Sequence, residues 1–403
     1  MFFDKIRTSE DIKKNNEEII NHCFDTVNLN LEIDDVDLPE DEILDQDKYK
    51  ITKLSIINDS QLEDSQLNEE IGKIVKNINR QLNSGELKKN WNIFYFYKEF
   101  IQQLKKLGFN YFRGQTDNWD LLPSFWRYHQ YKFELIKNFE NIYREIAEEL
   151  EEIEYYPIKA NLNDNASEIN MQFTRRDTKL GVLQHYGFPT PLIDITSNPY
   201  IAMLFMCDKK DSDSIGKSKR LDLFKINTIE DAEYNIFSSV FLGDKNKRIK
   251  AQKGEFFDFS KYEFVTIKNK IPHIVLELNY STVEYKISSE FFEFIINNVL
   301  DVNKGNFNKI ERRIKEEKIK IDDKTVESIK EAFENNESRL KFIKKFMKWK
   351  KEEDLASFVN CDLNSKLKEF NYTEKLMFPD TYNQLQFIRM KYEKNYPNCN
   401  DIF

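Results

Sequence analysis

The spacing of hydrophobic and polar positions changes several times along the chain. Apolar residues three or four positions apart predict helices at about 59–82, 91–107, 136–153 and 171–186. Apolar–polar alternation and short apolar runs predict strands at 109–115, 192–193, 220–226, 236–242, 248–257 and 273–278. From 289 to about 367 the pattern is helical and highly charged, and a last helix is expected from 378 to 392.

This mixture predicts an α+β fold, with a mostly antiparallel sheet core, flanking helices and a helical, charged C-terminal portion. The length of 403 residues allows two or three domains. We expect an acidic, helical N-terminal segment at 1–88, an α+β core at 89–287, a helical insertion or subdomain at 288–370 and a C-terminal helix completing the core at 371–403.

The segment 29–47 is rich in Asp and Glu, with isolated Leu and Ile residues and one proline. This composition predicts a surface segment or linker. An acidic arm that contacts a partner is the alternative.

Composition narrows the classes of partner. The 61 basic and 70 acidic residues give a net charge of -9, which disfavours a general nucleic-acid binder but leaves room for a local basic patch. The N-terminus lacks the apolar core of a signal peptide, and no run of about 18 apolar residues occurs. Four distant cysteines and four isolated histidines suggest neither disulfides nor a metal site. We therefore expect a soluble cytoplasmic protein without membrane contact.

One irregular stretch, 184–200, concentrates candidate chemistry. Gly187 and the prolines after it interrupt the helix, and Asn198 followed by Pro199 predicts the next helix start. The polar tip from Asp194 to Asn198 is thus expected between two buried elements. It is either a site or a turn whose Asp and Thr satisfy backbone groups. His185 just before it fits a buried imidazole bonded to the backbone.

A second candidate lies at the end of the strand 109–115. Arg113 precedes Gly114 and Gln115, and Arg127 follows as another cation. A guanidinium beside a bare backbone can clamp an anion and let a flat ligand approach closely. The alternative is a simple surface cation.

Three blocks of the sequence form a recognisable pattern. They are Tyr111 to Gln115 with Trp119, then Gln184 to Gly187 with Asp194 and Asn198 to Ala202, then Arg248 to Phe256. Together these blocks resemble the FRG domain, a bacterial family named for its Phe-Arg-Gly motif. The resemblance covers roughly 91–392 and departs at Pro191, where the family usually carries arginine, and at the long charged helical segment.

The layout of the blocks is similar to that of ADP-ribosyltransferases, and this similarity implies NAD as the substrate. It implies that Arg113 holds the diphosphate and ribose, that the Gly114 backbone takes the carboxamide, and that Thr196 and Ser197 line the pocket. Further expected contacts with the nucleotide are Gln115, Arg127, His185 and Asp194.

The third block should supply a carboxylate that stabilises positive charge on the sugar carbon as nicotinamide leaves. Gln252 stands at the position where this carboxylate is first expected. Glu255 is the nearest acid, and Glu277 on the next strand is the alternative. On one strand, residues 252 and 255 face opposite ways unless Gly254 makes a bulge.

Two functions from different classes remain. The first is an NAD-consuming transferase or glycohydrolase in phage defence or as a toxin, with a protein or nucleic-acid acceptor. The second is a non-catalytic protein that binds a nucleotide or a phage component. A hydrolase using Ser197, His185 and Asp194 is disfavoured because the chain has no Gly-x-Ser-x-Gly elbow. The first function expects Arg113, Thr196 and Gln252 or Glu255 to line one cleft.

Overall fold

The structure is a computed structural model. It describes residues 9–35, 49–58, 60–83, 92–127, 132–151, 153–159, 165–207, 218–240, 247–279, 289–300, 307–316 and 323–379.

Within the described residues, one eight-stranded sheet has the order β2-β1-β8-β5-β3-β4-β7-β6. Only β1 and β8 run parallel, and every other neighbouring pair is antiparallel. The predicted α+β class is therefore confirmed. The strands are β1 (Phe24–Asp35), β2 (Tyr49–Ile56), β3 (Tyr111–Gln115), β4 (Leu192–Thr196), β5 (Ser218–Phe224), β6 (Phe237–Ser238), β7 (Gly254–Asp258) and β8 (Ile271–Asn279).

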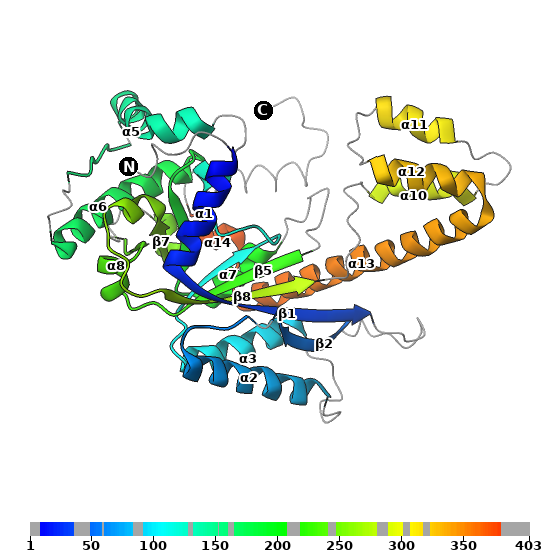
Figure 1. Ribbon diagram of the computed structural model, residues 1–403, viewed down its shortest axis with the longest axis horizontal. Coiled ribbons are helices and arrows are strands. Elements are labelled where there is room, and N and C mark those ends of the chain that lie inside the picture. Colours follow the sequence, from blue (N-terminus) through cyan, green and yellow to red (C-terminus); the bar gives the residue numbers. More distant parts are fainter. Residues whose placement is uncertain are drawn as a thin grey trace.

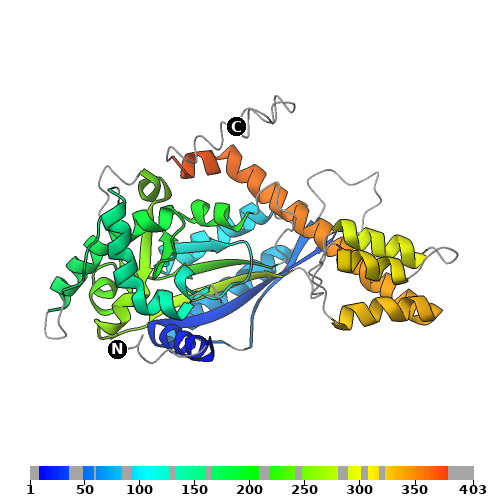
Figure 2. The ribbon, with the colours of Figure 1, turned by 90° about the horizontal axis from the view of Figure 1, so that it is seen from above.

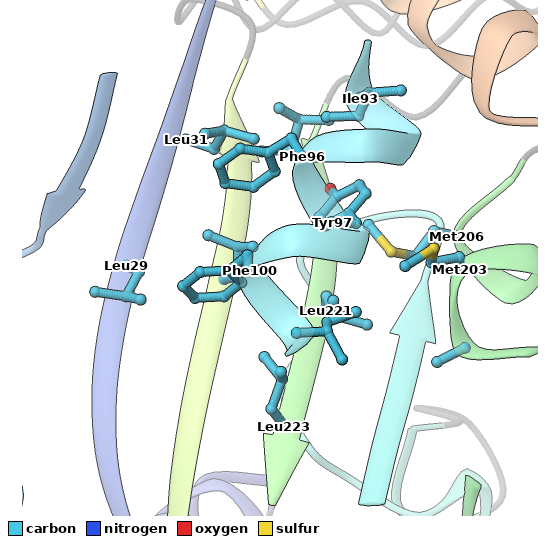
Figure 3. Close-up of a cluster of buried hydrophobic side chains, with 14 of the residues drawn as sticks. Leu29, Leu31, Ile93, Phe96, Tyr97, Phe100, Met203, Met206, Leu221 and Leu223 are labelled. Atoms are coloured by element: carbon cyan, nitrogen blue, oxygen red, sulfur yellow. The ribbon is translucent and has the colours of Figure 1, made fainter. Parts of the chain in front are cut away.

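One face of the sheet forms the larger hydrophobic core. Because side chains alternate along a strand, Leu29 and Leu31 of β1 point to the same face as Leu221 and Leu223 of β5. Helix α3 lies across these strands and fills the core with aromatic rings, as Figure 3 shows for Phe96, Tyr97 and Phe100. The helices in this core are α2 (Ser65–Asn83), α3 (Ile93–Lys106), α7 (Pro199–Met206) and the C-terminal half of α13 (Asn336–Glu369).

A second core surrounds β4, β6 and β7. It contains Leu180 and Leu183 of α6, and Phe256 and Phe257 of β7. Its helices gather at the end of the molecule away from α10–α12 (Figure 1). They are α1 (Ser9–Cys23), α5 (Lys132–Glu149), α6 (Ala166–His185) and α8 (Glu230–Tyr234).

The charged C-terminal portion is helical, as predicted. It forms a lobe with its own small core, which includes Ile295, Ile310, Ile329 and Phe342. Helix α13 runs from this lobe to the main body (Figure 2). The shorter helices of the lobe are α10 (Ser289–Leu300), α11 (Phe307–Glu316) and α12 (Asp323–Glu334).

Three predictions of secondary structure need correction or fall outside the described residues. Residues 29–35, predicted as a surface segment, lie in β1, a strand with two partners in the sheet. Residues 248–252, predicted as a strand, lie in α9 (Lys247–Gln252). Most of the predicted last helix, 380–392, lies outside the described residues, and the short helix α14 (Glu374–Met377) precedes it.

Candidate functional site

The candidate site lies where β3 and β4 separate. These strands share one paired position, Phe112 with Thr196, whereas each pairs over five residues with its other neighbour. A cavity of about 220 Å³ opens beside this junction. Its lining residues are Phe112, Arg113, Gly114, Gln115, Thr116, Trp119, Asp194, Ile195, Thr196, Phe205, Arg248, Gln252 and Gly254. We call it the Arg113 cavity.

Arg113 is anchored to the opposite strand. Its Nη1 donates a hydrogen bond of 2.7 Å to the backbone carbonyl of Asp194. Its Nε is buried and has no hydrogen-bond partner among the described residues. Burial lowers the pKa of Arg113, while the carboxylates of Asp194 and Asp222 raise it. A guanidinium remains charged in proteins, so the cavity holds a fixed cation.

Gly114 is required for packing against α7. A Cβ atom built at this position would lie 1.8 Å from the carbonyl oxygen of Ala202 and 2.8 Å from Cγ of Met206. The space that its missing side chain leaves is therefore filled by a helix, and only its backbone lines the cavity. The sequence interpretation, that glycine lets a flat ligand approach, does not explain this packing.

Asp194 carries the only carboxylate among the described residues that line the cavity. Its side chain is exposed, and its Oδ2 accepts a 2.6 Å hydrogen bond from Nε2 of Gln184. The hydroxyl of Thr190 donates to Oε1 of the same glutamine. Gly187, with φ of 85°, reverses the chain between α6 and β4 and so brings Gln184 beside Asp194.

Arg248 adds a second cation to the same cavity. It lies on α9, its charge acts on Asp194, and its guanidinium carbon lies 4.5 Å from the ring centroid of Phe378. Residues 248 and 252 lie on this helix and not on the predicted strand, and both line the cavity.

Thr196 and Gln252 are tied to backbone groups. The hydroxyl of Thr196 donates to the carbonyl of Gln252 at 2.7 Å and accepts from the N–H of Asn198 at 3.0 Å. Nε2 of Gln252 donates to the carbonyl of Met377 at 3.1 Å. For Thr196 the turn-and-cap interpretation therefore describes the observed contacts, and its hydroxyl is buried.

Glu255 lies next to the cavity without lining it. Its Oε2 accepts a 2.5 Å hydrogen bond from the N–H of Val240, and its charge acts on Tyr111. Burial raises the pKa of Glu255 to about 7, although the Val240 N–H lowers it. Gln252 and Glu255 are thus separated by the end of a helix, and only Gln252 reaches the cavity.

Gln115 connects the cavity to a buried polar network. Its Nε2 donates to the carbonyl of Trp119 at 3.0 Å and lies 3.4 Å from Oδ2 of Asp222, whereas its Oε1 has no partner among the described residues. Asp222 also accepts from Nε of Arg220 at 2.8 Å and contacts Nε2 of His273 at 2.9 Å. Burial alone raises the pKa of Asp222, but Arg220 and His273 hold it well below its usual range.

The remaining predicted residues lie elsewhere. Ser197 is exposed and lines a separate cavity, and His185 is half-buried at the end of α6. The side chain of Arg127 lies outside what the structure describes. Glu277 lies opposite Arg220 across β5 and β8 and raises the pKa of that arginine.

Among the lining residues that were not put forward as site residues from sequence, Arg248 and Trp119 carry chemistry that a ligand could use. Arg248 and Trp119 were recognised only as parts of the family blocks, and each side chain reaches the cavity. Trp119 is 49% exposed, so its indole is open to a ligand. The signal available in the sequence was a tryptophan six residues after Arg113.

Neither a metal site nor a membrane span is found in the part of the chain that the structure describes. No group of three or more His, Cys, Asp or Glu side chains there could hold a metal ion. No described helix has the length and apolarity needed to cross a membrane.

Comparison with known proteins gives one match. Residues 109–214 match the model of the FRG domain family. The match contains the first two sequence blocks and ends before the third, which supplies Arg248 and Gln252. No curated protein and no solved structure matches the chain.

Proposed function

Starting from the FRG domain that this chain contains, we propose that the Arg113 cavity binds a nucleotide and that NAD is its substrate. In this proposal the chain is an ADP-ribosyltransferase-like enzyme, a transferase or NAD glycohydrolase of bacterial phage defence or a toxin. The single observation that carries it is the convergence of Arg113, Arg248 and Asp194 on one cavity.

Two guanidinium groups in one cavity favour a phosphate-bearing ligand, since arginine binds phosphate through paired, charge-assisted hydrogen bonds. The exposed ring of Trp119 supplies a surface for a base or a nicotinamide ring. The cavity of about 220 Å³ lies below the roughly 300–1,000 Å³ of usual small-molecule sites. It therefore takes one base and sugar, and the rest of a dinucleotide extends beyond its mouth.

The reaction would break the N-glycosidic bond of NAD. The electron pair of that bond leaves with nicotinamide, and an oxygen of water or of an acceptor donates a pair to the ribose C1′ and loses its proton to solvent. A fixed negative charge stabilises the cationic sugar carbon. Asp194 is the carboxylate we assign to this role, because Glu255 does not line the cavity and residue 252 is an amide.

A non-catalytic recognition protein is the second candidate. The amide at Gln252, bonded to the carbonyl of Met377, favours it because the third block then offers no acid to the cavity. In that case the same residues bind a nucleotide without cleaving it.

Calorimetry of the full chain with NAD, ADP-ribose and nicotinamide, together with nicotinamide release by chromatography, tests the proposal. We expect Arg113→Lys to weaken ADP-ribose binding about tenfold or more, because lysine cannot form the paired hydrogen bonds of arginine. Arg175→Lys, at an exposed arginine of α6, is the matched control.

Asp194→Asn separates the two candidates. For an enzyme, we expect it to retain NAD binding and to lower nicotinamide release about 100-fold or more. NAD binding without nicotinamide release by the wild type favours the recognition protein. Equal affinities of the Arg113 and Arg175 variants for ADP-ribose contradict a nucleotide site in this cavity.

A further inference from the structure

A second, larger cavity lies on the other side of the β4–α7 turn. Its volume is about 540 Å³, within the range of roughly 300–1,000 Å³ usual for small-molecule sites. Thr196 lines the Arg113 cavity and the next residue, Ser197, lines this one. The lining residues are Lys98, Ile101, Gln102, Lys105, Ser197, Asn198, Pro199, Tyr200, Met203, Lys253 and Tyr372. We call it the lysine cavity.

The lysine cavity is basic within an acidic chain. Three lysines and no carboxylate occur among the described residues that line it, although the chain carries a net charge of -9. Lys98, Gln102 and Lys105 are four and three residues apart, so they lie along one exposed stripe of α3. Lys253 reaches the cavity from a separate segment, the turn between α9 and β7.

Lys253 has an unusual backbone. Its φ is 47°, in the left-handed region where Gly and Asn are favoured over lysine. Its carbonyl accepts a 3.2 Å hydrogen bond from the N–H of Ser197, which joins the two turns that border the cavity. A charged residue kept in a disfavoured conformation in the lining of a cavity points to function.

Two tyrosines line one side of the cavity, and neighbouring side chains hold them in place. The rings of Tyr200 and Tyr372 stack with centroids 5.1 Å apart. Tyr372 accepts a 3.1 Å hydrogen bond from Nδ2 of Asn198, and Tyr200 also stacks on Phe94 at 5.8 Å. Because Tyr200 already stacks on two rings, the half-buried ring of Tyr372 is the one that offers a flat face to a base.

We propose that the lysine cavity binds a small nucleoside polyphosphate. Its phosphates lie among Lys98, Lys105 and Lys253, and its base lies against Tyr372, which Tyr200 supports from behind. This site is distinct from the Arg113 cavity and stands whether or not that cavity binds NAD.

The test is titration of the full chain with inorganic triphosphate and with ATP at low and at physiological salt. We expect Lys253→Asn to weaken binding of both at least about fivefold, because a charge-assisted hydrogen bond is lost. Asparagine tolerates a positive φ, so the thermal midpoint should be unchanged or raised. Lys98→Gln and Lys105→Gln should weaken binding similarly, whereas Lys106→Gln, at an exposed lysine outside the cavity, should not.

Three results bear on the assignment. Loss of triphosphate binding in the three cavity variants with retained ADP-ribose binding supports a separate site. Equal triphosphate affinity in the Lys253 and Lys106 variants overturns the proposal. Binding of a short single-stranded oligonucleotide without binding of ATP or triphosphate overturns the assignment to a small ligand.

Discussion

At the scale of single residues, the polar groups around the Arg113 cavity divide by the contacts they make. The side chains of Thr196 and Gln252 donate their hydrogen bonds to backbone carbonyls. Arg113 keeps a buried donor without a partner among the described residues, and Asp194 keeps an exposed carboxylate. The charged and aromatic lining residues that remain to contact a ligand are Arg113, Arg248, Asp194 and the exposed Trp119.

Glu255 makes the stability of the protein depend on pH. Its pKa of about 7 in the folded protein lies above the ordinary value of 4.5. A raised carboxyl pKa stabilises the fold fully below about pH 4.5, and this contribution is lost as pH rises towards 7. Glu255→Gln keeps an acceptor for the Val240 N–H and removes the titration. Its free energy of unfolding relative to wild type should therefore rise by about 1–2 kcal/mol between pH 5 and 7.5, after allowance for partial solvent screening.

Urea unfolding of both proteins at several pH values measures this difference. Subtracting the wild-type curve removes the titration of groups that the two proteins share. A difference that stays constant over this pH range contradicts the assigned direction of the Glu255 shift.

At the scale of elements, the site depends on how closely α7 approaches β3. Because a Cβ at residue 114 would meet the Ala202 carbonyl at 1.8 Å, Gly114→Ala must displace the helix or the strand. We expect it to lower the free energy of unfolding by about 3 kcal/mol or more.

Gly72→Ala is the matched control for this substitution. Gly72 lies inside α2 and a Cβ there would meet no atom within 4 Å. The control should raise stability by up to about 1 kcal/mol, since alanine favours the helix. Denaturation curves that shift equally for both variants contradict a steric role for Gly114.

The elements also show what could be predicted from sequence. β3 and β8 were predicted correctly because each is a short local run of mostly apolar or alternating residues. The acidic composition of 29–47 predicts a surface segment, and this prediction is wrong for β1. Leu29, Leu31 and Ile33 alternate with polar residues, as in a strand, and are buried. For α9, burial of Ile249 and Gln252 fits a helix, but alternating polar and apolar letters over six residues also fit a strand.

The two cavities differ in how far each could be predicted from the sequence. Arg113 could be proposed from its own motif because the arginine and glycine are adjacent in sequence. The lysine cavity joins α3, α7 with its cap, the α9–β7 turn and the segment between α13 and α14, which are distant in sequence. No local pattern could show that these four segments meet.

At the scale of the whole molecule, α13 connects two cores. Phe342 near its start packs in the helical lobe, while Leu363 near its end packs in the sheet core. We expect Phe342→Ala to lower protection of lobe amides in hydrogen exchange and to leave the sheet protected, since the two clusters share no residue.

Leu363→Ala should lower the stability of the sheet core by about 2–5 kcal/mol. Equal loss of protection in both regions for both variants contradicts two separable cores.

The pairing of β1 with β8 has a consequence for biosynthesis. β1 leaves the ribosome long before β8, and β2 can cover only one of its edges in the interval. The nascent chain thus carries a strand with one apolar face and a free edge while most of the sheet is still untranslated, a state open to wrong intermolecular pairing. Molecular chaperones that shield β1 during translation should increase the yield of native protein.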